Sequence, residues 1–118
     1  MKIIEAISRV DALVPNGYAS GQKILWLSQL EALVHNQVLQ ENTPFVPLSE
    51  DTDTQGELTM EAPFDAAYLY WLEAQIHYAN EEIELYNGAI RLFSDAYRAF
   101  QLDYHGKHGA GALGRFRF

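Results

Sequence analysis

Apolar side chains recur at helical spacing near the start of the chain. One apolar stripe in residues 2–14 consists of Ile3, Ile7, Val10 and Val14. Charged residues separate these positions, so the stretch predicts an amphipathic helix with one face toward a core. The sequence Pro15-Asn16-Gly17 follows. Because proline and glycine interrupt helices, the first helix is expected to end there.

Residues 20–40 predict a second helix, with Ser20 as its N-cap. Its apolar positions form more than a single stripe: Ile24, Leu25, Trp26, Leu27, Leu30, Leu33, Val34, Val38 and Leu39. So wide an apolar surface requires more than one neighbour. The neighbours are either other helices of the monomer or another subunit.

Residues 41–63 interrupt the helical pattern. Three prolines, at positions 44, 47 and 63, together with Gly56 exclude a long helix here. Seven acids and no base lie between positions 41 and 65: Glu41, Glu50, Asp51, Asp53, Glu57, Glu61 and Asp65. A structureless loop of this length is uncommon in a compact domain and is usually functional or ordered by a partner.

The strongest periodicity lies in residues 64–104. Steps of three and four residues connect Leu69, Leu72, Ile76, Ala79, Ile83, Tyr86, Ile90, Phe93, Tyr97, Phe100 and Tyr104. This heptad pattern favours one long helix, continuous or gently bent. Asn80, Asn87 and Gly88 are the points where it would kink or split into two. Its aromatic content favours an all-α small helical bundle, with the two shorter N-terminal helices packed across it.

The composition fits one helical domain, residues 1–105, followed by a basic tail. The chain has 118 residues and 48% of them are hydrophobic, enough for a modest core. The tail, residues 106–118, is rich in glycine and is expected to be flexible. There is no cysteine, which excludes disulfides and thiolate metal sites. No export signal and no apolar run of about 20 residues is evident, so no membrane association is expected.

Charge is distributed unevenly along the chain. Residues 1–105 hold all 16 acids and five of the eight bases, a net charge of −11, whereas residues 106–118 carry +3. An acidic body argues against tight wrapping of nucleic acid, which needs a basic surface. The basic tail is either a solvated end or a segment that docks onto an acidic partner.

The acidic stretch "SEDTDTQGE", residues 49–57, partly matches a calcium-binding EF-hand loop. Asp51, Asp53 and Gly56 fit positions 1, 3 and 6 of that loop. Gln55 is neutral at position 5, and Ala62 has no ligand oxygen at position 12, where a bidentate glutamate is required. The stretch is therefore interpreted as a solvated or partner-facing acidic loop, with no metal bound.

A second candidate is the row Glu73, His77 and Glu81, spaced four residues apart along the expected long helix. A di-metal site in a bundle repeats a Glu-x-x-His pair on two helices, and that repetition is absent. The row is interpreted as a solvated helix face. No nucleophile motif or phosphate-binding glycine loop occurs, so we expect neither enzymatic activity nor a cofactor.

Three stretches resemble a known group of proteins. They are "PNGYASGQKILWLSQLE" (15–31), "EDTDTQGELTMEAPFDAAYLYWLEAQI" (50–76) and "YANEEIELYNGAIRLFSDAYRAF" (78–100). The best matching positions are Tyr18, Trp26, Leu27, Pro63, Phe64, Tyr68, Leu69, Leu72, Glu73, Ala74, Tyr86, Asn87, Phe93 and Tyr97. Together they are similar to small head–tail connector, or adaptor, proteins of tailed phages and prophages of Gram-positive hosts. The second half of the acidic loop and the ending "RFRF" depart from that pattern.

The resemblance implies a structural virion protein. Such connectors form a homo-oligomeric ring beneath the portal, extend the DNA channel and receive the next connector or the tail. The protein would then reside in the host cytoplasm during assembly and afterwards in the virion neck. In a ring, the carboxylates of Glu50, Asp51, Asp53 and Glu57 would either face the channel, repelling DNA phosphates during passage, or face an interface.

The receptor of the tail and the class of the protein's partner each have more than one candidate. Arg115-Phe116-Arg117-Phe118 is a candidate docking segment for the portal protein or a neighbouring subunit, with phenylalanine as anchor and arginine as charge partner. The alternative is a small acidic helical chaperone or antitoxin-like module that holds a single partner. Such a module would be a monomer or a dimer.

Overall fold

The structure, a computed structural model, describes residues 1–40 and 42–108. Four α-helices follow one another: α1 (Ile3–Leu13), α2 (Ser20–Leu33), α3 (Ala66–Ala79) and α4 (Ile83–His108). A short π-helical extension, η1 (Val34–Leu39), continues α2 without interruption. The chain is therefore an all-α bundle of small helices ending in one long helix, as the sequence predicts.

The two N-terminal helices lie where the apolar pattern places them. α1 buries Ile3, Ile7 and Val10 on one face. Ser20 is not the N-cap of α2, because the helix already includes it and Ala19 occupies the capping position. At the other end of this helical segment, the Gln40 amide donates to the His35 carbonyl over 2.9 Å, a five-residue span that makes the last turn π-helical.

The expectation of one continuous helix over residues 64–104 is wrong. α3 ends at Ala79, and Glu81 adopts a left-handed backbone conformation with φ of 62°. The Glu82 amide donates to the His77 carbonyl and the Glu81 amide to the Tyr78 carbonyl, over 2.9 and 3.0 Å. This pair of bonds is a Schellman motif, which satisfies the last carbonyls of a helix. The chain then reverses into α4.

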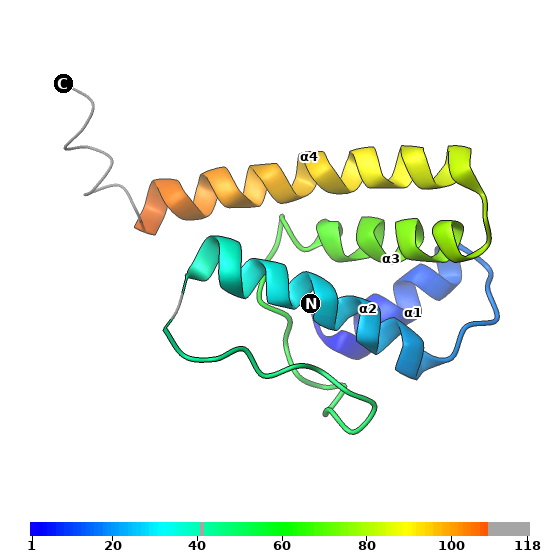
Figure 1. Cartoon of the computed structure of the whole chain (residues 1–118), viewed down its shortest axis with the longest axis horizontal. Coiled ribbons are helices and arrows are strands. Elements are labelled where there is room, and N and C mark those ends of the chain that lie inside the picture. The colour runs from blue at the N-terminus through cyan, green and yellow to red at the C-terminus, as the bar shows by residue number, and fades with distance from the viewer. Residues whose placement is uncertain (41, 109–118) are drawn as a thin grey trace.

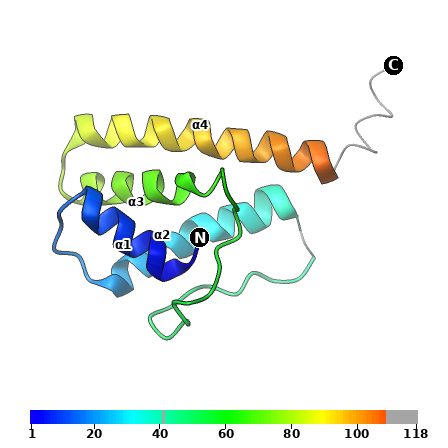
Figure 2. The ribbon, with the colours of Figure 1, turned by 180° about the vertical axis from the view of Figure 1, so that it is seen from behind.

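α3 is the central helix of the bundle. Figure 1 shows α4 lying antiparallel to α3 on one side, with α1 and α2 on the other side. The view from behind in Figure 2 has the same arrangement. The apolar face of α2 thus has the several neighbours that its width requires.

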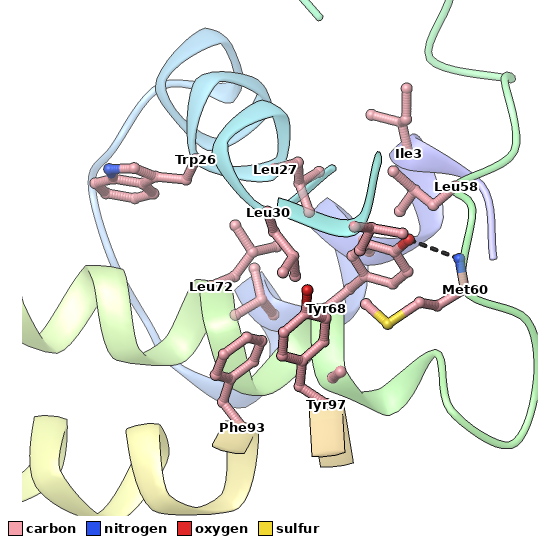
Figure 3. Close-up of a cluster of buried hydrophobic side chains, with 14 of the residues drawn as sticks. Ile3, Trp26, Leu27, Leu30, Leu58, Met60, Tyr68, Leu72, Phe93 and Tyr97 are labelled. Carbon is pink, nitrogen blue, oxygen red and sulfur yellow. Dashed lines mark hydrogen bonds between the residues drawn. The ribbon is translucent and has the colours of Figure 1, made fainter. Parts of the chain in front are cut away.

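Many of the heptad positions lie in the core between these layers, whereas Ala79 and Ile83, beside the turn, are exposed. Leu72 and Ile76 of α3 are completely buried, and Phe93, Tyr97 and Phe100 of α4 are at most 8% exposed. Figure 3 shows Phe93 and Tyr97 reaching from α4 toward Leu72 and Tyr68. The Trp71 and Phe93 rings lie 5.0 Å apart in a tilted contact. These three aromatic residues of the seam, Phe93, Tyr97 and Phe100, are therefore core within one chain.

Residues 42–65 run from η1 to α3 without a helix, as the prolines predict. Within them, Glu57 forms an isolated antiparallel bridge with Lys2, and Leu58 and Met60 are buried. Gly106 and Lys107 belong to α4, so the domain boundary expected at residue 105 lies inside a helix. The flexibility expected of residues 109–118 concerns a part of the chain outside the described residues. No helix within residues 1–40 and 42–108 is long and apolar enough to cross a bilayer.

Candidate functional site

The acidic stretch of residues 49–57 folds as a pair of local turns. The Ser49 amide donates to the Thr52 hydroxyl over 2.8 Å, and the Thr52 amide donates to the Ser49 carbonyl over 3.0 Å. The Asp53 carboxylate then accepts from the Gln55 amide over 3.0 Å, an Asx-turn. These bonds hold Asp51 and Asp53 exposed at the surface.

The end of this stretch caps helix α1. The carbonyls of Thr54 and Gly56 accept from the amides of Ile4 and Ile3 over 2.9 and 3.0 Å. First-turn amides have no partner inside a helix, so these bonds satisfy the helix terminus. The Glu57 carboxylate lies 3.1 Å from the Met1 amino group. Glu57 is therefore an ion-pair partner of the bundle, although its side chain is 65% exposed.

Glu50 lies against the first turn of α2. A side chain at Gly21 would meet the Glu50 carboxylate within 2.5 Å, so only glycine leaves room for this approach. An anion beside a helix N-terminus is favoured by the helix dipole. Of the four acids singled out in the sequence, Glu50 and Glu57 thus have neighbours within the bundle. Asp51 and Asp53 have no cationic partner among the described residues.

The structure does not bring the second candidate row together. Glu81 lies in the turn after α3, and His77 instead lies 3.0 Å from Glu82 through its Nδ1 atom. That contact with His77, joined by Asn80, lowers the pKa of Glu82. Burial raises the pKa of Glu73. Among residues 1–40 and 42–108, no group of three potential metal ligands occurs.

A buried polar cluster fastens the acidic segment to the bundle. Glu31 of α2 accepts a short hydrogen bond from the Tyr68 hydroxyl at one carboxylate oxygen. Its other oxygen accepts from the Thr59 amide and hydroxyl over 3.1 and 2.8 Å. The Tyr68 hydroxyl in turn accepts from the Met60 amide over 2.8 Å, the dashed line in Figure 3. Three separate segments therefore meet at one carboxylate.

The environment of Tyr68 opposes ionisation. Burial raises the pKa of this phenol well above its ordinary range, and the Glu31 charge and hydrogen bond raise it further. A neutral Tyr68 is then the hydrogen-bond donor to Glu31 across the whole physiological range. This cluster was not anticipated, although Glu31 stands on the apolar stripe of residues 27, 34 and 38, where an acid is unexpected.

Lys23 forms a second buried contact that the sequence analysis missed. Its ammonium group, 3% exposed, lies 2.6 Å from the Asp11 carboxylate of α1. Burial opposes ionisation of Asp11, but hydrogen bonds from Lys23 and Asn16 outweigh it and lower the pKa of Asp11. The pair links α1 to α2, so it is structural.

A cavity of about 330 Å³ opens near the end of α4. Its apolar walls are Leu39, Phe64, Phe100 and Tyr104. The carboxylates of Glu61 and Asp103 and the Lys107 ammonium group complete the rim. Asp103 and Lys107 lie 3.1 Å apart, one helical turn from each other. The cavity therefore combines aromatic surface with negative charge.

The exposed side of α4 carries apolar residues and two arginines. Leu85, Leu92 and Leu102 are 53%, 49% and 63% exposed. Arg91 and Arg98 are exposed as well, and neither has an ion-pair partner in the part of the chain that the structure describes. Leu85 and Leu92 are seven residues apart, as are the arginines, so each pair forms a stripe along the helix. We call these five residues the α4 surface.

The α4 surface and the acidic turns belong to opposite sides of the molecule. In Figure 1, α4 runs along one edge, and the turns of residues 49–56 project at the opposite edge, beyond α1 and α2. Figure 2 shows the same separation from behind. The molecule therefore presents unpaired arginines and apolar side chains, together with the exposed acids Glu84 and Asp95, on the α4 side and the unpaired carboxylates of Asp51 and Asp53 on the other.

The proposed docking residues Arg115, Phe116, Arg117 and Phe118 lie outside the described residues. The comparisons with known proteins add no assignment for the described surfaces. The chain matches no protein-family model, and neither a curated protein nor a solved structure is significantly similar to it.

Proposed function

We propose that this chain is a non-enzymatic structural subunit that assembles head to tail with copies of itself. The observation that carries the proposal is the placement of the α4 surface and the acidic turns on opposite sides of one small bundle. A ring of identical subunits needs such a heterologous contact, in which two different patches meet.

The two patches have complementary chemistry. Arg91 and Arg98 provide guanidinium groups, which bind carboxylates in a planar, two-bonded geometry. Asp51 and Asp53 provide exposed carboxylates on a turn that its own hydrogen bonds keep in shape. Leu85 and Leu92 supply apolar area beside the arginines. Apolar area supports affinity, while the charge pairs select the register of the contact.

The more specific role rests on the sequence resemblance. Together with a head-to-tail contact, it supports a head–tail connector that forms a ring beneath the phage portal and extends the DNA channel. Its partners are then the portal protein and the next connector or tail protein. Its location is the host cytoplasm during assembly and later the virion neck.

Charge reversal tests the contact directly. The purified chain, alone and mixed with the portal protein from the same genome, is examined by sedimentation velocity and negative-stain electron microscopy. Rings are expected for the unchanged chain in at least one of these conditions. R91E/R98E abolishes them, and combining it with D51R, which leaves the Asx-turn of Asp53 intact, restores them. Arg9→Glu, an exposed arginine on α1, is the matched control and leaves rings intact.

The outcomes separate the two roles considered for the acidic turns. If neutralising Glu50, Asp51, Asp53 and Glu57 leaves rings intact but slows DNA packaging or ejection, the carboxylates face the channel and the interface assignment is wrong. If the chain stays a monomer or dimer even with the portal protein and binds one other partner at equal stoichiometry, the chaperone or antitoxin-like alternative replaces the connector.

A further inference from the structure

The cavity near the end of α4 lacks an occupant in the described part of the chain. Phe64, before α3, and Phe100, on α4, form its aromatic walls, with ring centroids 6.0 Å apart in an edge-on arrangement. Leu39 closes the apolar side from the end of η1. Its volume of about 330 Å³ is at the lower end of the range of ~300–1,000 Å³ for ligand sites. One aromatic side chain with adjoining backbone suits such a space.

The rim selects for positive charge. Asp103 already lies against Lys107 at one helical turn. Glu61, on the other side of the cavity, has no ion-pair partner among residues 1–40 and 42–108. A second cation beside a phenyl ring would therefore complement the cavity in both charge and shape. The segment "RFRF", residues 115–118, has this chemistry, with cations and rings alternating.

We infer that this cavity is the intramolecular docking site of Arg115-Phe116-Arg117-Phe118. One phenylalanine ring enters the cavity and packs against the Phe64–Phe100 pair, and the flanking arginines approach Glu61 and Asp103. The inference concerns the chain by itself and does not rest on the proposed ring. From sequence, the expected receptors for this segment were the portal protein and a neighbouring subunit. The inference places the receptor on the same molecule instead.

The stretch of chain between α4 and Arg115 is long enough to bring residues 115–118 back to the cavity. Lys107 itself lines the cavity, and Phe100 lies seven residues before it, roughly 10 Å along the helix axis. Arg115 is seven positions after His108, the last residue of α4, and an extended chain of that length reaches roughly 24 Å. Gly109, Gly111 and Gly114 allow the backbone conformations that a reversal requires. A tethered segment also has an effective concentration in the millimolar range, which favours its own molecule over another.

The experiment uses the full chain with ¹³C-labelled phenylalanine and leucine. Nuclear Overhauser contacts are expected from the Phe116 or Phe118 ring to Leu39, Phe64 or Phe100. They should persist on tenfold dilution and be absent between molecules in a sample of labelled and unlabelled chains mixed in equal amounts. F116A/F118A removes the contacts and shifts the Phe64 and Phe100 signals, while far-UV circular dichroism shows an intact bundle.

Charge variants provide the matched comparison. E61Q and D103N each raise the ratio of open to docked tail by about two- to fivefold, the size expected of exposed ion pairs. Asp95→Asn, another exposed acid on α4 that does not line the cavity, leaves the ratio unchanged. Contacts that appear only between molecules overturn the inference, as does a Phe64 signal insensitive to F116A/F118A.

Discussion

The α3–α4 pair and the segment of residues 42–65 are ordered by different means. The helix pair is held by repeated burial: Leu72 and Ile76 of α3 and Phe93, Tyr97 and Phe100 of α4 are all buried in one hydrophobic cluster. The segment has no such repetition. It is held at particular residues, by the burial of Leu58 and Met60 and by polar bonds, chiefly those of Thr59 and Met60 to Glu31 and Tyr68.

Substitutions in these two regions should therefore have different consequences. Burial is shared among many side chains, so a loss in the helix pair weakens the whole bundle in proportion to the cavity left behind. The polar cluster concentrates three donors on one carboxylate, so losing that group orphans all of them together. A substitution in the polar cluster should release residues 42–65 from the bundle before the helices separate.

The largest effect is expected at the centre of the helix pair. Leu72→Ala should lower the free energy of unfolding by about 3–4 kcal/mol, because a completely buried leucine leaves a cavity in the helix that contacts all three others. Urea unfolding followed by circular dichroism measures it. Leu92→Ala, at a half-exposed position of α4, is the control and should cost less than about 0.5 kcal/mol. Equal costs would show that α3 is not the central helix.

Glu31→Ala should have the next largest effect and lower the free energy of unfolding by about 3 kcal/mol. The substitution leaves the Thr59 amide, the Thr59 hydroxyl and the Tyr68 hydroxyl without their acceptor. Hydrogen exchange should accelerate at the Met60 amide before it accelerates in α3. The exposed Glu84→Ala serves as the control. Uniform acceleration across the helices would contradict a local role for the cluster.

Tyr68 should make stability fall at alkaline pH. Its pKa is raised in the fold from an ordinary value of 10.0, by burial first and by Glu31 second. The stability it contributes is therefore fully present below pH 10 and is lost as pH rises above it, by about 1.4 kcal/mol per pH unit for one proton. Tyr68→Phe should flatten this decline between pH 10 and 11. Tyr78→Phe, at an exposed tyrosine, should leave the decline unchanged.

The smallest effect concerns the turn between the paired helices. Glu81→Gly should stabilise the protein by about 1 kcal/mol, since glycine adopts the left-handed conformation without the steric cost that glutamate bears. Thermal unfolding measures the gain. Glu84→Gly, in the first turn of α4, should instead destabilise by up to about 1 kcal/mol. A loss of stability in both variants would argue against the left-handed conformation of Glu81.

Much of the fold follows from local pattern. The apolar stripe of residues 3–10 and the breakers at 15–17 determined α1, and the prolines between 44 and 63 determined a segment without helix. The reversal after Ala79 was not determined this way. The four-residue step from Ala79 to Ile83 crosses the turn, so the heptad spacing continues through it and conceals the break.

The features of the candidate surfaces likewise divide into those that follow from local sequence and those that follow from the fold. Sequence alone identified the carboxylates of Asp51 and Asp53 and the cations and rings of residues 115–118, because charge and residue type are local properties. Three further features depend on how the chain folds: Glu57 pairs with the amino group of Met1, Glu31 lies beside Tyr68, and the acidic turns lie opposite α4. These relations join residues up to 56 positions apart in sequence. The two contacts exist only after the loop has returned to α1 and α2, and α4 takes its place only after the chain has reversed at residues 80–82. Hydrophobic periodicity carries no record of either event.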